Sequence, residues 1–154
     1  MAGKYAEGTT VSPDRSQAEI LSTLRRYGAQ GFAFGEEDNR AFVGFRFADR
    51  NVRFDLVLPK HWSDSQFVFD GAGRIRNDTA KKSAFEKEIA RLWRCLALAI
   101  KAKLEVVESG IATFEEEFLA HIVLPGGRTV GSHVVPQLDS GVMPTSLLAI
   151  GAAE

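Results

Sequence analysis

One long helical pattern constrains the fold of this chain more than any other feature of its sequence. No glycine or proline occurs between Ala80 and Ser109. Within this stretch apolar residues recur at steps of three and four, the spacing of one helical face. They are Phe85, Ile89, Leu92, Trp93, Leu96, Ile100, Leu104 and Val107. A helix with so wide an apolar face must be covered by a sheet or by other helices.

A first helix is expected over residues 13–27. Ser12 and Pro13 are typical of an N-cap followed by proline at the first helical position. Gly28 is a suitable stop after the last apolar residues of this helix.

Two shorter helices are expected after Gly110, which ends the long one. Thr113 and Glu116 have the spacing of a capping box, so a helix should begin there. The Leu124–Gly127 segment has the composition of a turn, and Thr129 is placed to cap a last helix through residue 138.

Between the first and the long helix the apolar residues alternate with a period of two. Strands are expected over residues 41–48 and 52–58, joined by a loop at residues 49–51, with a shorter strand near residues 32–34 and a polar turn over residues 36–40. Residues 9–11 and 67–69 are weaker candidates for further strands. One face of the two main strands is apolar and should point toward the helices: Ala41, Val43, Phe45 and Phe47, with Val52, Phe54, Leu56 and Leu58.

These elements predict an α+β fold in which a small antiparallel sheet of three to five strands packs on the long helix and on shorter helices. A chain of 154 residues has the size of one domain. We therefore expect a single domain over residues 1–154, with a loose N-terminal arm at residues 1–8 and a C-terminal tail at residues 141–154.

Composition limits the classes of partner. The formal net charge is −1, whereas a dedicated, sequence-independent duplex binder is usually clearly basic. Cys95 is the only cysteine, so no disulfide can form within the chain and a reducing compartment is expected. No signal-like N-terminus and no run of about 18 apolar residues occurs, so we expect a cytoplasmic protein without a membrane partner.

The other face of the two main strands is a candidate binding surface. It should carry Phe42, Gly44, Arg46, Arg53 and Asp55, because side chains alternate along a strand. An aromatic ring, a glycine and two arginines are typical of a platform on which single-stranded bases stack. The alternative is an ordinary solvated sheet surface with cross-strand Arg–Asp pairs.

A basic segment before the long helix could extend such a surface. Arg74, Arg76, Lys81 and Lys82 follow the flexible Gly71–Gly73 stretch and would supply contacts to phosphates. A glycine-rich basic stretch before a helix is also commonly just solvated, and this alternative stays open.

No motif in the sequence is specific for a reaction or for a cofactor. Glu117 and His121 are four residues apart, a spacing that can hold a metal between two side chains, but no second histidine is near in sequence. Their acidic neighbours fit the capping of the helix better. No nucleophile elbow, phosphate loop or dinucleotide fingerprint occurs, so neither a cofactor nor a catalytic site is expected.

Several segments together resemble a known group of proteins. Residues 15–20, 26–29, 96–105 and 108–119 are similar to those of small, mostly uncharacterised proteins encoded in bacteriophage and prophage genomes, and residues 101–131 are the most specific part. The resemblance offers no catalytic motif to carry over. It implies a setting, namely DNA replication, recombination or defence evasion in the cytoplasm of a host cell.

Three functional hypotheses follow. The first is a non-catalytic protein that binds single-stranded nucleic acid through the sheet residues Phe42, Arg46 and Arg53 and the basic segment. The second is a protein-interaction module that blocks or adapts a host protein, using a helix face or the apolar tail (Val142, Leu147, Leu148 and Ile150), with a homodimer as one form. The third is an enzyme acting on nucleotides or nucleic acid through Glu117 and His121.

Overall fold

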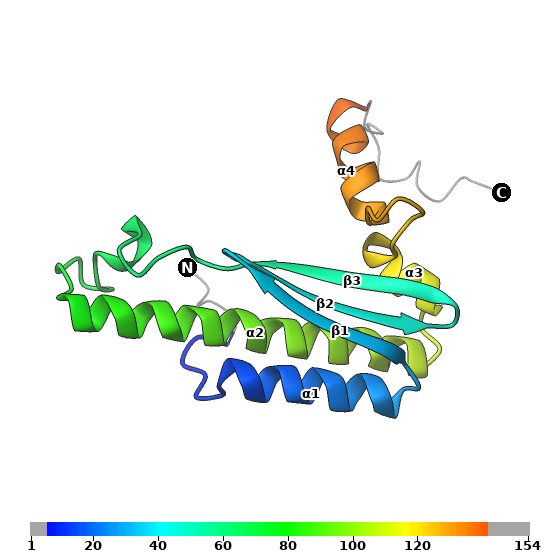
Figure 1. Ribbon diagram of the computed structural model, residues 1–154, viewed down its shortest axis with the longest axis horizontal. Helices are drawn as coiled ribbons and strands as arrows, with labels where there is room; N and C mark the ends of the chain where they lie inside the picture. The colour runs from blue at the N-terminus through cyan, green and yellow to red at the C-terminus, as the bar shows by residue number, and fades with distance from the viewer. Residues whose placement is uncertain (1–5, 142–154) are drawn as a thin grey trace.

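The computed structural model describes residues 6–141. The helices and strands follow the order α1 (Pro13–Arg26), β1 (Gln30–Glu37), β2 (Arg40–Phe47), β3 (Arg50–Val57), the 3-10 helix η1 (Ser65–Phe67), α2 (Asp78–Glu108), α3 (Phe114–Phe118), the 3-10 helix η2 (Leu119–His121) and α4 (Val130–Ser140). The sheet lies against α2, and α1 runs beside α2 (Figure 1). The predicted α+β class is confirmed, with three antiparallel strands.

The sheet is a meander in the order β1-β2-β3. Two residues separate β2 from β3, and both of them, Ala48 and Asp49, have positive φ angles of 46° and 60°. Two positive φ angles are the signature of the type I′ turn, whose twist matches that of the strands it joins. The expected loop at residues 49–51 is therefore wrong: the turn is shorter and β3 begins at Arg50.

The inner face of the sheet forms the core with the helices. Val43, Phe45 and Phe54 are buried against apolar side chains of α1 and α2. Phe118 of α3 is fully buried, and its ring meets the rings of Phe45 and Phe54 edge-on, each at a centroid distance of 6.1 Å. The predicted apolar side of the two main strands is thus the side that packs.

α2 is longer than the sheet that covers it. The Asn77 side chain caps its first turn, accepting from the backbone of Ala80 at 2.9 Å, and Gly110 follows its end with a φ of 72°. The buried residues of α2 all lie in its second half, from Trp93 onward. Its first half runs beyond the end of the sheet (Figure 1), so the apolar residues there stay partly exposed.

α1 has the predicted start and packs along α2. The Ser12 hydroxyl accepts from the backbone of Arg15 at 3.3 Å, and the helix ends at Arg26 before Gly28. An ion pair between Glu19 and Arg94 and a hydrogen bond of 2.6 Å from the Tyr27 hydroxyl to Glu105 join the two helices.

Two of the weaker strand predictions are wrong. Residues 9–11 form no strand, and residues 65–67 form η1 instead of the start of an edge strand. Phe67 is buried because its ring meets the ring of Phe85 on α2 at 5.7 Å, and only Phe69 pairs in β fashion, in an isolated bridge with Ile75. Phe67 therefore packs on a helix, whereas Phe69 is 54% exposed.

The segment that follows α2 lies beside the end of the sheet where β2 turns into β3 (Figure 1). Ile122 forms a bridge with Val52 of β3, and the predicted turn closes with a hydrogen bond of 2.9 Å from Gly127 to Leu124. Thr129 caps α4 as expected, by accepting from the backbone of Ser132. α4 then stands away from the rest of the molecule (Figure 1). The predicted tail, with its four apolar residues, lies outside the described residues beyond position 141.

Candidate nucleic-acid interface

The outer side of the sheet carries a surface that we call the open face. The strand register places every second residue of β2 and β3 on it, and the same holds for β1 after an irregularity between Gln30 and Ala33. It consists of Gln30, Ala33, Gly35 and Glu37 from β1, Arg40, Phe42, Gly44 and Arg46 from β2, and Asn51, Arg53, Asp55 and Val57 from β3. None of these residues is buried, whereas the inner face of β2 and β3 includes the buried residues Ala41, Val43, Phe45, Val52 and Phe54.

Phe42 lies flat on this surface because Gly35 is beside it. The two residues are register partners, and a Cβ atom added to Gly35 would lie only 2.1 Å from Cε1 of Phe42. The ring therefore occupies the space that any other residue at position 35 would fill. Phe42 is 36% exposed. One side of an aromatic ring is thus supported by the sheet while part of it remains in contact with solvent.

Arg46 and Arg53 lie on the same face, as predicted from their strands. Arg53 is opposite Gly44 and Arg46 is opposite Asn51, so the two arginines are diagonal neighbours. Within residues 6–141, Arg46 makes one long contact, 3.5 Å from Nη2 to the side-chain oxygen of Gln30.

Arg53 is held much more firmly than Arg46. Its Nε lies 3.0 Å from Oδ1 of Asp55, and its Nη1 donates to the carbonyl oxygen of Gly127 at 2.9 Å. An Arg–Asp pair is therefore present on this face, but it lies within β3 and does not join two strands as the alternative expected; it fixes the direction of one guanidinium. The second bond ties the open face to the turn that precedes α4.

A shallow hollow of about 600 Å³ lies on the open face, at the end of the sheet where the chain turns from β1 into β2. Phe42, Arg53 and Asp55 line it together with Arg40, which sequence reasoning missed. Arg40 was assigned to a polar turn, whereas it is the first residue of β2. The alternation of side chains along β2 could have indicated its place, because positions 40, 42, 44 and 46 share one side of the strand.

The basic segment does not join this hollow. Arg74 lies 4.0 Å from Asp70, Arg76 donates to the carbonyl oxygens of Phe67 and Phe69, Lys81 pairs with Asp78 at 3.3 Å, and Lys82 lies 5.0 Å from the ring centre of Trp62. None of the four lines the hollow on the open face. In Figure 1 their segment lies beyond the end of the sheet. Each of these four side chains therefore contacts a group in residues 62–78, close to its own position in the chain.

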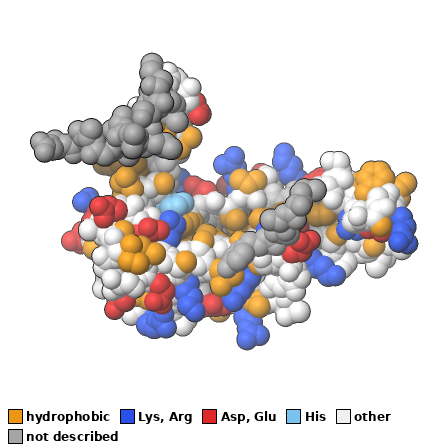
Figure 2. All heavy atoms as spheres, turned by 180° about the vertical axis from the view of Figure 1, so that it is seen from behind, with side chains coloured by type: hydrophobic (Ala, Val, Ile, Leu, Met, Phe, Trp, Pro, Cys, Tyr) orange, Lys and Arg blue, Asp and Glu red, His pale blue; other side chains and the backbone are white. Residues whose placement is uncertain are grey.

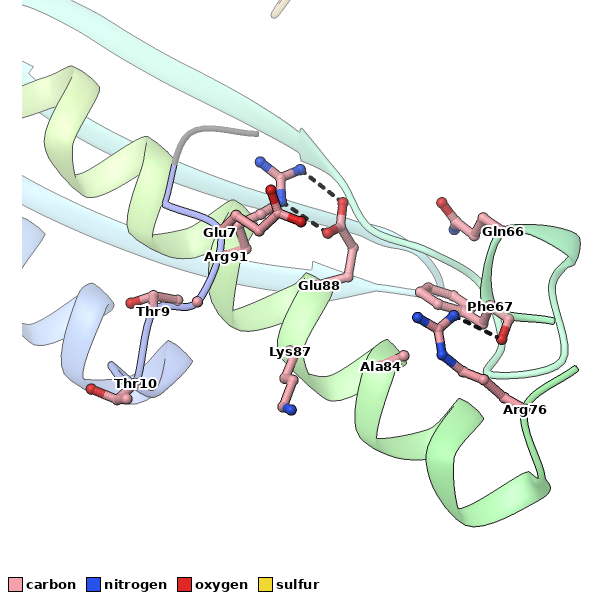
Figure 3. A pocket seen from close by; sticks show the side chains of 11 residues that line it. Glu7, Thr9, Thr10, Gln66, Phe67, Arg76, Ala84, Lys87, Glu88 and Arg91 are labelled. Carbon is pink, nitrogen blue, oxygen red and sulfur yellow. Dashed lines mark hydrogen bonds and ion pairs between the residues drawn. The ribbon is translucent and has the colours of Figure 1, made fainter. Parts of the chain in front are cut away.

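Arg76 instead borders a separate cavity of about 440 Å³ between the N-terminal arm, η1 and α2. Figure 3 shows the Glu88 carboxylate paired with Arg91 along one side of this cavity, at 2.7 Å, and Arg76 turned toward the backbone of Phe67. Acidic and basic groups are mixed in its walls, and Glu88 and Arg91 pair with each other there.

Charges of both signs are also mixed over the wider surface. Figure 2 shows Lys and Arg side chains interspersed with Asp and Glu, without an extended block of one sign on that view. This distribution agrees with the near-zero net charge. Attraction of a nucleic acid would therefore depend on local groups rather than on a field of the whole molecule.

Glu117 and His121 are engaged in packing and an ion pair. Glu117 accepts from Nζ of Lys103 at 3.0 Å, and the His121 ring stacks on Phe54 at 3.9 Å. Burial lowers the pKa of His121, and the charge of Lys103 lowers it further. No group of three or more potential metal-ligating side chains gathers anywhere in residues 6–141.

The predicted capping box explains the acidic cluster before His121. The Thr113 hydroxyl accepts from the backbone of Glu116 at 3.2 Å, and the Glu116 carboxylate accepts from the backbone of Thr113 at 2.7 Å. These hydrogen bonds lower the pKa of Glu116.

Comparison of the chain with models of protein families, with curated proteins and with solved structures found no match. Among the helices in residues 6–141, none is both long and apolar enough to span a membrane.

Proposed function

We propose that this protein binds single-stranded nucleic acid on the open face of its sheet and does so without catalysing a reaction. The observation that carries the proposal is the shared position of Phe42, Arg46 and Arg53 on one uncovered surface, with Arg40 beside them. The phage-like sequence segments support replication or recombination of DNA in a host cytoplasm as the setting.

The chemistry of the face fits single strands better than duplexes. A base in a single strand can present its flat side to Phe42, whereas bases in a duplex are stacked on one another. Arg40 and Arg53 line the hollow with Phe42, and Arg46 lies further along β2 on the same face, so these guanidinium groups would take phosphates of a strand that follows the face. The acidic residues Glu37 and Asp55 share this face, which limits the gain from charge alone and leaves more of the affinity to stacking.

The double variant Arg46→Ala with Arg53→Ala tests the proposal. We expect it to lose most binding to a short single-stranded DNA in a fluorescence anisotropy titration at low salt. The matched control is Arg15→Ala with Lys101→Ala, which removes the same charge from exposed positions of α1 and α2. The control should bind nearly as well as the wild type, because its cations lie on the helical layer.

Salt dependence provides a second readout of the same interface. For single strands the logarithm of the affinity should fall with the logarithm of salt by about 0.7 for each phosphate contact. We therefore expect a shallower slope for the double variant than for the wild type. Equal binding by the double variant, with an unchanged melting temperature, would exclude the open face as the interface.

A second candidate function is a protein-interaction module, favoured by the exposed apolar side chains of α4. Val134, Val135 and Leu138 are 36%, 53% and 59% exposed, and α4 has no buried residue. If this helix joins two copies of the chain, size-exclusion chromatography with light scattering should give a dimer mass that Leu138→Asp reduces to a monomer mass. A dimer together with no binding of oligonucleotide would favour this function over the first.

A further inference from the structure

The hollow on the open face combines an aromatic floor with both acidic and basic rims. Its lining includes Gly35, Glu37, Arg40, Phe42, Arg53 and Asp55, and its volume is about 600 Å³. This volume lies within the range of sites for small organic ligands. Carboxylates beside the cations would weaken a surface that bound only phosphates, because both groups are negatively charged. The acidic groups therefore indicate a second kind of contact with the ligand.

Asp55 lines the same hollow as Phe42, although the Phe42 ring extends over Gly35 of β1, on the opposite side of β2 from Asp55. It is the direct cross-strand partner of Phe42, on the same face. In antiparallel pairs such partners have Cβ atoms about 4.5–5.5 Å apart. A base that stacks on the Phe42 ring and extends across β2 would therefore present one of its edges to Asp55.

The direction of this carboxylate is fixed by Arg53. The Nε atom of Arg53 lies 3.0 Å from Oδ1 of Asp55 and 3.2 Å from Oδ2. An ionised carboxylate has about four acceptor positions, so each oxygen can still accept another hydrogen bond. The Asp55 side chain is 53% exposed, which leaves room for a ligand to approach it.

The bases differ in what they can offer to a carboxylate. The Watson–Crick edge of guanine carries two adjacent donors, N1–H and the N2 amino group, which can bind both carboxylate oxygens at once. Adenine and cytosine place a ring-nitrogen acceptor beside their amino group, and thymine and uracil place carbonyl oxygens on both sides of N3–H. These acceptors would repel the carboxylate, because neither partner has a proton to donate.

We propose that Asp55 selects guanine as the base that stacks on Phe42, so that the hollow is a guanine site within a single strand. This inference rests on the proposed function and adds a preference to it. Arg40 and Arg53 would take the phosphates that flank the base, while Glu37 lies on the other side of β2.

The test compares thymine-rich DNA 9-mers that differ only at the central base. In anisotropy titrations we expect the guanine 9-mer to bind at least about fivefold more tightly than the adenine, cytosine and thymine 9-mers, as one bidentate contact allows. An inosine 9-mer, which lacks only the N2 amino group, should lose most of this advantage.

Two variants assign the preference to a residue. Asp55→Asn has one acceptor oxygen in place of two, so it should bind all five 9-mers with similar affinity while it still binds the thymine 9-mer. Glu37→Gln is the matched control, because it removes an acidic residue of the same hollow, and it should keep the preference for guanine.

The possible results separate the inference from the proposed function. Equal affinity of the wild type for all 9-mers overturns the guanine site and leaves single-strand binding intact. No binding of any 9-mer overturns both. A preference lost in Glu37→Gln and kept in Asp55→Asn overturns the role of Asp55, and tight binding of free guanosine monophosphate in place of the 9-mer overturns the single strand as the source of the base.

Discussion

The two faces of the sheet are made by the same three strands and differ in almost every other respect. On the inner face, Val43, Phe45 and Phe54 are almost completely buried by helices. On the open face, their immediate neighbours Phe42 and Arg53 remain in contact with solvent. β2 and β3 therefore each contribute one set of residues to stability and a second set to a surface, whereas β1 has no buried residue.

This separation means that the two faces should respond differently to substitution. A change on the inner face should lower the free energy of unfolding, whereas a change on the open face should leave stability almost unchanged and affect binding. The following predictions test that difference, beginning with the largest expected effect.

Phe118→Ala should be the most damaging single change. Its ring is fully buried against the inner face, and removing such a ring costs about 3–5 kcal/mol of stability because a cavity is left behind. Urea denaturation followed by circular dichroism would measure the loss. The control Leu119→Ala removes an adjacent residue that is 52% exposed, and it should change stability by no more than about 0.5 kcal/mol. Equal losses in the two variants would contradict the role of the buried Phe118 ring in stabilising the inner face.

Phe42→Ala should weaken the binding of a single-stranded oligonucleotide by about 1–3 kcal/mol, the usual value for one stacked base. Phe34→Ala is a matched control, because Phe34 and Phe42 are both 36% exposed but Phe34 is paired with the inward residue Val43. The control should retain its affinity in anisotropy titrations. If both variants lost affinity equally, binding would not be confined to the open face.

Thr113→Ala should cost about 1 kcal/mol of stability, because α3 would lose its N-cap and with it the placement of Phe118 on the inner face. Thr113→Ser keeps the hydroxyl group and should restore most of the loss. Denaturation midpoints for the three proteins would give the comparison. No difference between the alanine and serine variants would mean that the cap does not support the inner face.

His121→Phe should produce the smallest effect, visible only as a change in pH dependence. Because burial lowers the pKa of His121, the unfolded state binds a proton at a higher pH than the folded state does. The contribution of His121 to stability is thus fully present above its unfolded pKa, near 6.5, and is lost as the pH falls through its lower folded pKa. The phenylalanine variant keeps the stack on Phe54 and should show a smaller loss of melting temperature between pH 7 and pH 5. Identical pH profiles would contradict the assignment.

The helices and the inner face could be predicted because their signals are local. Alternation along β2 and β3 assigned the apolar residues to one side, and the caps at Ser12 and Thr113 depend only on residues within one helical turn. The turn at Ala48 was missed because alanine rarely adopts a positive φ angle and therefore gives no sign of a turn.

The candidate site was predictable only in part, since it depends on how distant segments meet. The shared face of Arg46 and Arg53 follows from strand alternation and the hairpin alone. The local engagement of Arg76, by contrast, depends on two carbonyl groups exposed by the fold of η1, which no spacing indicates. The bond from Arg53 to Gly127 joins residues 74 positions apart and has no counterpart in the sequence pattern.

The meander has one more consequence, for the order in which the chain folds. Its strands pair only with sequence neighbours through two-residue turns, so closing each hairpin costs little chain entropy. Hairpins of this kind form in about 1–10 μs, whereas the contacts of α1 with α2 must bring together positions such as Glu19 and Arg94, 75 residues apart. We expect residues 30–57 to serve as the folding nucleus, and α1 and α2 to join each other late.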